Sequence, residues 1–214
     1  MSRSWSERLV NSAGIEKIHE AVLATEAKTS AEIVPMVVRS SSLTGHVAWI
    51  LFLFFLVCYW AVAAQLRPQF SVLLMDACGL ILSGLLAWLL SRATWVQRIC
   101  TPKSDQLLGV QHRALLEFHL SRINTTENHT GVLIFVSILE RQAVILADES
   151  IAQRFPEKTW QELIDHLLRE TRQGDFAAGM CAAIENLGEI LPSEFPPLGG
   201  RAPHELADRL VIKD

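Results

Sequence analysis

Two long apolar runs follow each other near the middle of the chain and dominate its pattern of hydrophobic and polar positions. The first, residues 46–66, has no formally charged side chain, and the second, residues 72–90, has one, Asp76. Each is close to the ~20 residues that a helix needs to cross the hydrocarbon core of a bilayer. Only residues 67–71 separate them. The pattern therefore predicts two transmembrane helices joined by a short external turn.

A pair of buried core helices in a soluble protein is the alternative interpretation of these runs. A helix of a soluble protein normally keeps a polar face, and the first run has none. Asp76 stands near the start of the second run, where a carboxylate costs much less free energy than at the bilayer centre. Small residues let helices approach closely. We therefore place four residues at the transmembrane interface: Asp76, Gly79, Ser83 and Gly84.

Charged residues predict the orientation of this hairpin. Five Lys or Arg side chains precede the first run, whereas the turn between the runs has only Arg67. Because cytoplasmic loops carry an excess of Lys and Arg, both termini are expected on the cytoplasmic side. Residues 1–45 lack an early apolar core, so no signal peptide is expected. Residues 101–214 carry more acidic than basic groups, which argues against a nucleic-acid partner, since that requires a basic footprint.

The polar segments on either side of the hairpin predict one α/β domain that the hairpin interrupts. Residues 1–45 offer a helix and a strand, and residues 91–191 offer three helices and two strands. Neither set can bury a core alone, but together they give a mixed sheet with helices on both faces. The tail, residues 192–214, is rich in Pro and Gly at its start and is expected to be extended or disordered. The predicted helices cover residues 13–28, 105–122, 157–172 and 175–191, and the predicted strands cover 32–38, 132–138 and 143–147.

Individual residues refine these elements. Pro35 cannot donate a hydrogen bond, so the first strand is expected to lie at an edge or to be bulged there. The run 132–138 is almost continuously apolar, which is typical of a central strand covered on both faces. In the helix that follows the hairpin, Leu108, Leu115 and Phe118 are expected to face the core.

Five short motifs follow one another through the polar segments. They are Thr29–Val34 (TSAEIV), Thr130–Val136 (TGVLIFV), Glu140-Arg141, Ala147-Asp148, and Arg172–Asp175 (RQGD) ahead of Gly179. Together, over about residues 5–191 apart from the hairpin, they resemble the TPM domain. That is the family of the thylakoid lumen acid phosphatase, the photosystem II repair protein and a nematode receptor regulator. The run Glu205–Leu210 (ELADRL) resembles the tail of its bacterial membrane subclass, in which a hairpin interrupts the domain.

The resemblance implies a three-layer α/β/α fold in a protein of the bacterial inner membrane. Some members of the family act as acid phosphatases, some bind calcium, and many have no known activity. Proteins of the membrane subclass are often encoded beside LemA-type membrane proteins. A LemA-type protein or a second TPM-like subunit is therefore the partner that the resemblance implies.

Carboxylates at the ends of strands are the candidate site residues. Glu32 and Asp148 are the candidate catalytic pair, because sheet ends are favoured ligand sites in α/β folds. The alternative is a cap or a surface ion pair, with Asp148 capping the next helix. Asp148, Glu149 and Asp175 are candidate ligands for calcium, which prefers hard oxygen donors.

Two functions from different classes are compatible with these residues. The favoured one is a non-enzymatic interaction and assembly module at the cytoplasmic face, with the hairpin in the lipid bilayer and no cofactor. The alternative is a membrane-tethered phosphatase of small phosphoesters. In that case carboxylates would hold Ca²⁺ or Mg²⁺, which polarises the phosphoryl oxygen.

Overall fold

The computed structural model describes residues 5–41, 45–66, 72–123, 129–197 and 209–213 of the chain. It divides the chain into two compact units. The first unit joins Met1–Ser41 to Leu107–Asp214, and the second is Ser42–Gln106. The helices are α1 (Trp5–Leu9), α2 (Ser12–Glu26), α3 (Gly45–Leu66), α4 (Val72–Ser91), α5 (Thr94–Cys100), α6 (Lys103–Leu120), α7 (Glu149–Ala152), α8 (Glu157–Gln173) and α9 (Phe176–Ile190), with a short 3-10 helix, η2, at Leu191–Ser193. The strands are β1 (Glu32–Val38), β2 (Gly131–Ser137), β3 (Gln142–Ala147) and β4 (Val211–Lys213).

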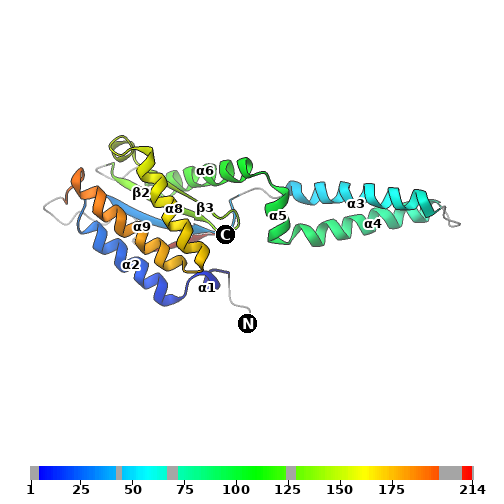
Figure 1. The fold of residues 1–214 in the computed structure, drawn as a ribbon, viewed down its shortest axis with the longest axis horizontal. Helices are drawn as coiled ribbons and strands as arrows, with labels where there is room; N and C mark the ends of the chain where they lie inside the picture. The colour runs from blue at the N-terminus through cyan, green and yellow to red at the C-terminus, as the bar shows by residue number, and fades with distance from the viewer. Residues whose placement is uncertain (1–4, 42–44, 67–71, 124–128, 198–208, 214) are drawn as a thin grey trace. The chain divides into compact units, whose positions relative to one another are not determined.

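The first unit is mixed α/β and contains one four-stranded sheet with the order β3-β2-β1-β4 (Figure 1). β1 and β2 run parallel and pair along their whole length, from Glu32 with Gly131 to Val38 with Ser137. β2 and β3 form an antiparallel hairpin. The partner strands β1 and β2 lie on opposite sides of the inserted second unit in the sequence, so both segments contribute to one sheet.

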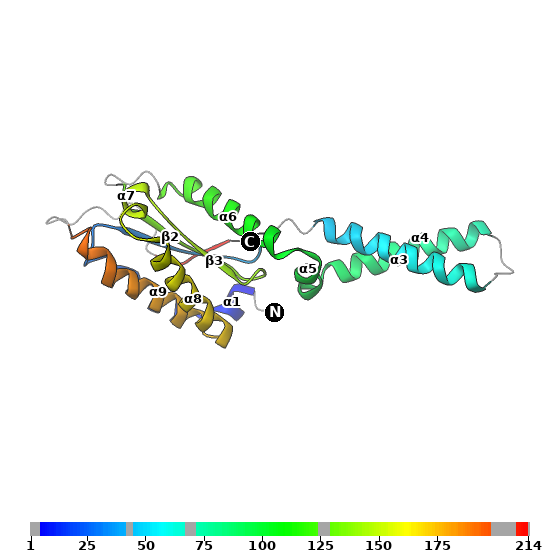
Figure 2. The ribbon, with the colours of Figure 1, turned by 45° about the horizontal axis from the view of Figure 1, so that its top comes forward.

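Helices cover both faces of the sheet (Figure 2). Alternate residues of a strand point to opposite faces, and β1 shows this plainly. Ile33 and Val37 belong to a core with α2, α8 and α9, whereas Val34 and Met36 belong to a second core with α6. Both β1 and β2 are buried on both faces, which explains why their sequences are apolar almost without interruption.

Pro35 occupies the side of β1 on which the ladder is incomplete. In a parallel pair, successive residues of a strand direct their N–H groups to opposite neighbours. The N–H of Glu32 donates to Thr130 of the segment leading into β2, at 3.1 Å, so the odd-numbered residues face the other way. There β4 pairs only with Met36–Val38. The N–H of Ile33 donates to the Glu26 carboxylate at 2.9 Å. Pro35, which has no N–H to donate, therefore lies between Ile33, whose N–H is bound by Glu26, and the residues that pair with β4. No ladder hydrogen bond is lost there, and the strand stays regular.

The inner face of α6 differs from the one that the sequence pattern predicted. Phe118 packs on the sheet as expected, but its companions are Val110 and Ala114. Leu108 and Leu115 were predicted to face the core and are instead exposed. The small side chains of Val110 and Ala114 let the helix approach the sheet closely, and this leaves the larger leucines on the outer surface.

The C-terminal strand β4 was not predicted, because the tail was expected to be extended or disordered. It pairs in parallel with β1 and is tied to α6 as well. The Lys213 Nζ lies 2.5 Å from Oε2 of Glu117, whose Oε1 lies 3.0 Å from Arg113 Nε. The Glu117 side chain is 3% exposed, so this ion pair is sheltered on its acidic side. Three residues of strand are too few to show an apolar pattern in the sequence.

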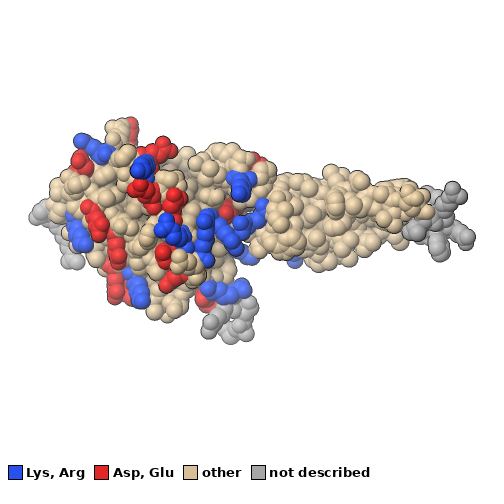
Figure 3. Space-filling view, viewed as in Figure 1, with Lys and Arg blue, Asp and Glu red and all other residues tan. Residues whose placement is uncertain are grey.

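The second unit contains α3 and α4 side by side, followed by α5. Residues His46–Gln65 of α3 form a helix long and apolar enough to cross a membrane, with almost all of its side chains unburied. Asp76–Ser91 of α4 meets that criterion only together with Thr94–Cys100, and a bend of 98° separates the two segments. The surface over α3 and α4 is almost wholly free of charged side chains (Figure 3).

The contact between α3 and α4 uses some of the small residues that were placed there. A methyl group on Gly79 would lie 2.2 Å from the Tyr59 ring, so the two helices meet closely at this point. Ser83 is buried and Asp76 is half-buried. Gly84 faces open space, with no atom within 4 Å of a Cβ built there. Gly84 therefore does not bring the helices together.

Gly79 and Gly84 provide a matched pair for testing this contact. Gly79→Ala should destabilise the protein by about 1–3 kcal/mol, because the added methyl group must displace the Tyr59 ring. Gly84→Ala should leave stability unchanged or raise it slightly, since Ala is the better helix former. Thermal unfolding of both variants in neutral detergent provides the measurement. Equal midpoints for the two variants would contradict the packing described here.

Candidate functional site

Glu32, Gly131 and Asp148 form one row across three strands of the sheet. Glu32 is paired with Gly131, and the N–H of Asp148 donates to the Gly131 carbonyl at 2.9 Å. Residues in register across a sheet project to the same face. In this row that is the face covered by α6, which also receives Val34 and Leu133. The structure therefore brings the two candidate catalytic residues to one end and one face of the sheet.

Gly131 fixes the spacing of this carboxylate pair. Neighbouring strands are about 4.8 Å apart, so the backbones of Glu32 and Asp148 are separated by roughly 10 Å with Gly131 between them. A Cβ on Gly131 would lie 2.2 Å from the carbonyl oxygen of Ile123. The chain beyond α6 thus lies directly on the glycine, and only a residue without a side chain fits under it.

Asp148 is the more buried member of the pair. Its side chain is only 8% exposed, and it stands at the first position before α7. It makes no capping hydrogen bond to that helix. Its Oδ2 atom is buried and has no hydrogen-bond partner among the described residues. Burial of a carboxylate oxygen without a donor costs free energy, so neither alternative role suggested by the sequence, helix cap or surface pair, accounts for this residue.

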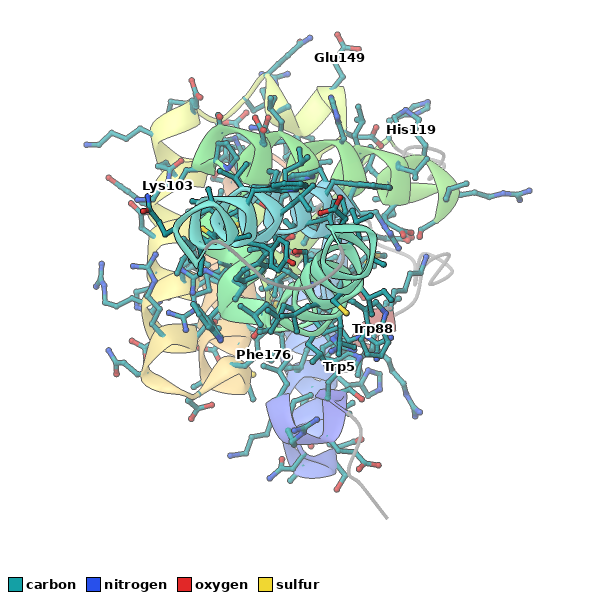
Figure 4. The ribbon with its side chains drawn as sticks, turned by 90° about the vertical axis from the view of Figure 1, so that its right-hand side faces the viewer. Trp5, Trp88, Lys103, His119, Glu149 and Phe176 are labelled. Atoms are coloured by element: carbon teal, nitrogen blue, oxygen red, sulfur yellow. The ribbon has the colours of Figure 1, made fainter. Side chains whose placement is uncertain are left out.

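The structure places the other proposed metal ligands separately. Glu149 is exposed and points outward from the body of the molecule (Figure 4), where its carboxylate accepts a hydrogen bond from Gln153. Asp175 caps α9 by accepting the N–H of Ala178 at 2.9 Å. Over the ranges that the structure describes, no three His, Cys, Asp or Glu side chains are grouped to hold a metal ion. Asp148, Glu149 and Asp175 are therefore not brought together as a calcium site.

An exposed apolar surface on α6 was missed from the sequence. Four leucines cover the outer side of this helix and are each 49–66% exposed. Successive members are seven, one and four residues apart, which at 3.6 residues per turn places all four on one broad side of the helix. We call this surface the leucine face: Leu108, Leu115, Leu116 and Leu120. The signal was present in the sequence, but the apolar period of α6 was assigned to the wrong side.

A groove of about 590 Å³ lies between α2 and α9. Small residues of both helices line it, including Gly14 and Ala178, and Cys181 forms part of its wall. Burial, and after it the charge of Glu185, raises the pKa of the Cys181 thiol. The thiolate is the reactive form of cysteine, so Cys181 is expected to be a slow nucleophile at neutral pH.

Comparison with known proteins adds to this geometry. The model of the TPM domain matches residues 96–190. The chain carries a TPM domain. The match runs from α5 to the end of α9 and leaves out α2 and β1. In the structure α2 and β1 belong to the same unit as residues 107–190 of the match. A comparison with curated proteins found no match.

A solved structure is similar to the whole chain. It is the NMR structure of the BA42 protein from the psychrophilic bacterium Bizionia argentinensis, with a TM-score of 0.61 and 18% sequence identity, covering 100% of both chains. At this identity the likeness concerns the fold alone. It agrees with the TPM match in placing the chain among mixed α/β proteins.

The reactivity of Cys181 tests the environment of the α2–α9 groove. In a chain whose other cysteines are replaced by Ser, Cys181 should react with a maleimide only as the pH rises above the range of an ordinary thiol, because its pKa is raised. Glu185→Gln should lower that pKa and increase the rate at fixed pH by about two- to threefold. Glu189→Gln, one turn further along α9, serves as the control and should leave the rate unchanged. The replaced cysteines are Cys58, Cys78 and Cys100.

Proposed function

We propose that the protein is an integral membrane protein whose TPM unit is a cytoplasmic module for assembly with other membrane proteins. The exposed leucine face of α6 is the observation that carries this proposal. The hairpin of residues 46–66 and 72–90 would anchor the module in the bacterial inner membrane. The TPM fold would then run over residues 5–191, interrupted by the hairpin, with three α/β/α layers.

The apolar surface of α3 and α4 supports the membrane anchor. Large apolar side chains of α3 are exposed, among them Trp49, Val57 and Trp60. Soluble monomers rarely expose contiguous apolar patches of more than a few hundred Å², and a bilayer would cover this surface. β1 and β2 precede and follow the hairpin yet share a sheet, so both ends of the hairpin must return to one side. The excess of basic residues assigns that side to the cytoplasm.

The leucine face supports the proposal that the module binds a partner protein. From residue 107 to residue 120, α6 has only two charged side chains, Arg113 and Glu117, and these bind each other at 3.0 Å. The outer side of the helix therefore has no unpaired charge that an apolar partner would have to desolvate. An apolar helix face without charge is a typical contact for a groove or helix of another protein. A LemA-type membrane protein or a second TPM-like subunit is the partner we propose.

Phosphatase activity is the second candidate, and the buried Asp148 is the observation in its favour. Mg²⁺ is usually bound by one or two carboxylates, with water and substrate phosphate completing its shell. Glu32 and Asp148 supply two carboxylates on one face of the sheet. These residues fit Mg²⁺ better than Ca²⁺, which takes six to eight oxygen ligands. The cation would polarise a phosphoryl oxygen, and Glu32 and Asp148 would hold it at the sheet end.

Substitution of the leucine face tests the assembly module. Leu116→Lys with Leu120→Lys should remove the stoichiometric partner that co-purifies from membranes in neutral detergent, because each lysine would place an ammonium group in the contact. Unfolding midpoints should stay unchanged, since both positions are exposed. Leu23→Lys, an exposed leucine on α2, is the matched control and should retain the partner.

Two outcomes would overturn the parts of this proposal separately. Recovery of the wild-type chain alone, whatever the detergent, would contradict the assembly module. Release of the chain from membranes by alkaline carbonate would contradict the anchor, because a transmembrane helix resists that extraction.

Hydrolysis of a phosphoester by the purified protein tests the second candidate. Activity should depend on Mg²⁺ and should fall at least tenfold in Asp148→Ala, which removes a proposed cation ligand. Glu149→Gln changes an exposed neighbour and should leave the rate unchanged. A rate equal to background, with or without Mg²⁺ or Ca²⁺, would exclude the enzyme on the substrates assayed.

A further inference from the structure

Three arginines stand at the end of the sheet where β1 finishes. Arg39 follows β1, Arg141 lies in the turn between β2 and β3, and Arg172 lies in the last turn of α8. All three are exposed. In the part of the chain that the structure describes, none of them forms an ion pair with a carboxylate. Lys and Arg side chains gather around α1 and the adjacent end of the sheet (Figure 3).

Hydrogen bonds and a shared hollow bring these arginines to one place. The N–H of Leu139 donates to the Arg39 carbonyl at 3.0 Å, which holds the β2–β3 turn against the end of β1. Arg141 and Arg172 both line a hollow of about 190 Å³. Its apolar wall includes Leu9 and Leu168. The hollow therefore combines two guanidinium groups with aliphatic surface.

The Glu140 carboxylate, in the same turn as Arg141, accepts hydrogen bonds from neighbouring serines. Glu140 is 3% exposed and accepts hydrogen bonds from the Ser40 hydroxyl at 3.1 Å and the Ser41 N–H at 3.2 Å. Its other oxygen accepts from the Ser137 hydroxyl at 2.5 Å. Glu140 thus ties the end of β1 to the β2–β3 turn and leaves the arginine charge uncompensated. Arginine binds phosphate in a bidentate manner, so this surface is suited to a phosphate group.

The short segment between Arg39 and α3 limits how far this surface can lie from the proposed membrane anchor. α3 begins at Gly45, only six residues after Arg39. Six extended residues span at most about 20 Å. If α3 crosses the bilayer, Arg39 lies close to the headgroup layer, and anionic lipids there attract Lys and Arg within about a Debye length. Arg92, at the other end of the hairpin, stacks over Trp88 at 3.9 Å, an arrangement typical of side chains at a membrane interface.

We propose that Arg39, Arg141 and Arg172 form a binding surface for anionic phospholipid headgroups, with the phosphate held between Arg141 and Arg172. This inference rests on the proposed membrane anchor and goes beyond it, because it names the lipid class that the TPM unit contacts. Bound lipid would fix the orientation of the module on the membrane.

Lipid-dependent stability of the full chain in neutral detergent tests the proposal. Phosphatidylglycerol added to the micelles should raise the unfolding midpoint of the wild-type protein, and phosphatidylcholine should not. Arg141→Gln with Arg172→Gln should weaken phosphatidylglycerol binding by about fivefold for each arginine, and added salt should weaken wild-type binding. The matched control is Arg154→Gln with Lys158→Gln, which removes two exposed cations that already pair with Glu194 and Glu162. The control should bind like the wild type.

Several results would overturn the proposal. Equal stabilisation by the two lipids, or equal losses in the test and control variants, would show that the arginines do not select a headgroup. Stabilisation by inorganic phosphate as strong as that by the lipid would assign the surface to free phosphate. If the test variant fails to fold, native mass spectrometry of the wild type decides, and equal retention of both lipids refutes the proposal. Alkaline extraction reports on the anchor itself, so failure of the anchor is distinguished from failure of headgroup binding.

Discussion

The parallel pairing of β1 with β2 is the constraint on which the rest of the structure depends. A parallel pair cannot be closed by a tight turn and needs a long crossover connection. Here the crossover contains α3, α4, α5 and α6, so two largely unburied apolar helices are inserted between adjacent strands of one sheet. The pairing from Glu32 to Val38 requires that both ends of this crossover lie in the same compartment. If α3 and α4 cross a membrane, as proposed, these backbone hydrogen bonds allow only an even number of crossings, independently of any count of basic residues.

α6, the last helix of this crossover, has a different role on each of its two sides. Its inner side closes the sheet through Val110, Ala114 and Phe118, and the residues after it cover Gly131 in the row of Glu32 and Asp148. Its outer side presents leucines without free charge. A single helix therefore supports the candidate carboxylate site on one side and the proposed partner surface on the other. A partner bound to the outer leucines would restrain the element that lies over the carboxylates.

Much of the fold could be predicted from the sequence because its strands are short, apolar and bounded by turn residues. The mixed α/β class and the existence of β1, β2 and β3 followed from these patterns. The side of α6 that faces the core could not be assigned, since Leu108 and Leu115 satisfy the helical period as well as Val110 and Ala114 do. The space that the sheet leaves for the helix accepts the smaller side chains of Val110 and Ala114, and that space exists only in the folded structure. β4 could not be found because its pairing with β1 depends on tertiary contact rather than on local pattern.

The candidate site was predictable in part and for a topological reason. Strand ends identified Glu32 and Asp148, but their alignment on either side of Gly131 depends on the register of three strands, which the sequence does not encode locally. The proposed calcium ligands failed to assemble because Asp175 belongs to the start of α9 and is occupied by the N–H of Ala178. Arg39 was counted only as charge, and Arg141 and Arg172 only as parts of short motifs, since the hollow between α1, α8 and the β2–β3 turn exists only after folding.

The order of the strands in the sheet has a consequence for biosynthesis. β1 leaves the ribosome first, but its neighbours β2 and β4 are translated only after the whole apolar hairpin has emerged. At roughly 5–20 residues per second, β1 waits several seconds with both edges unpaired. An unpaired apolar strand is a template for aggregation. The sheet around β1 is therefore complete only once translation has reached Val211–Lys213.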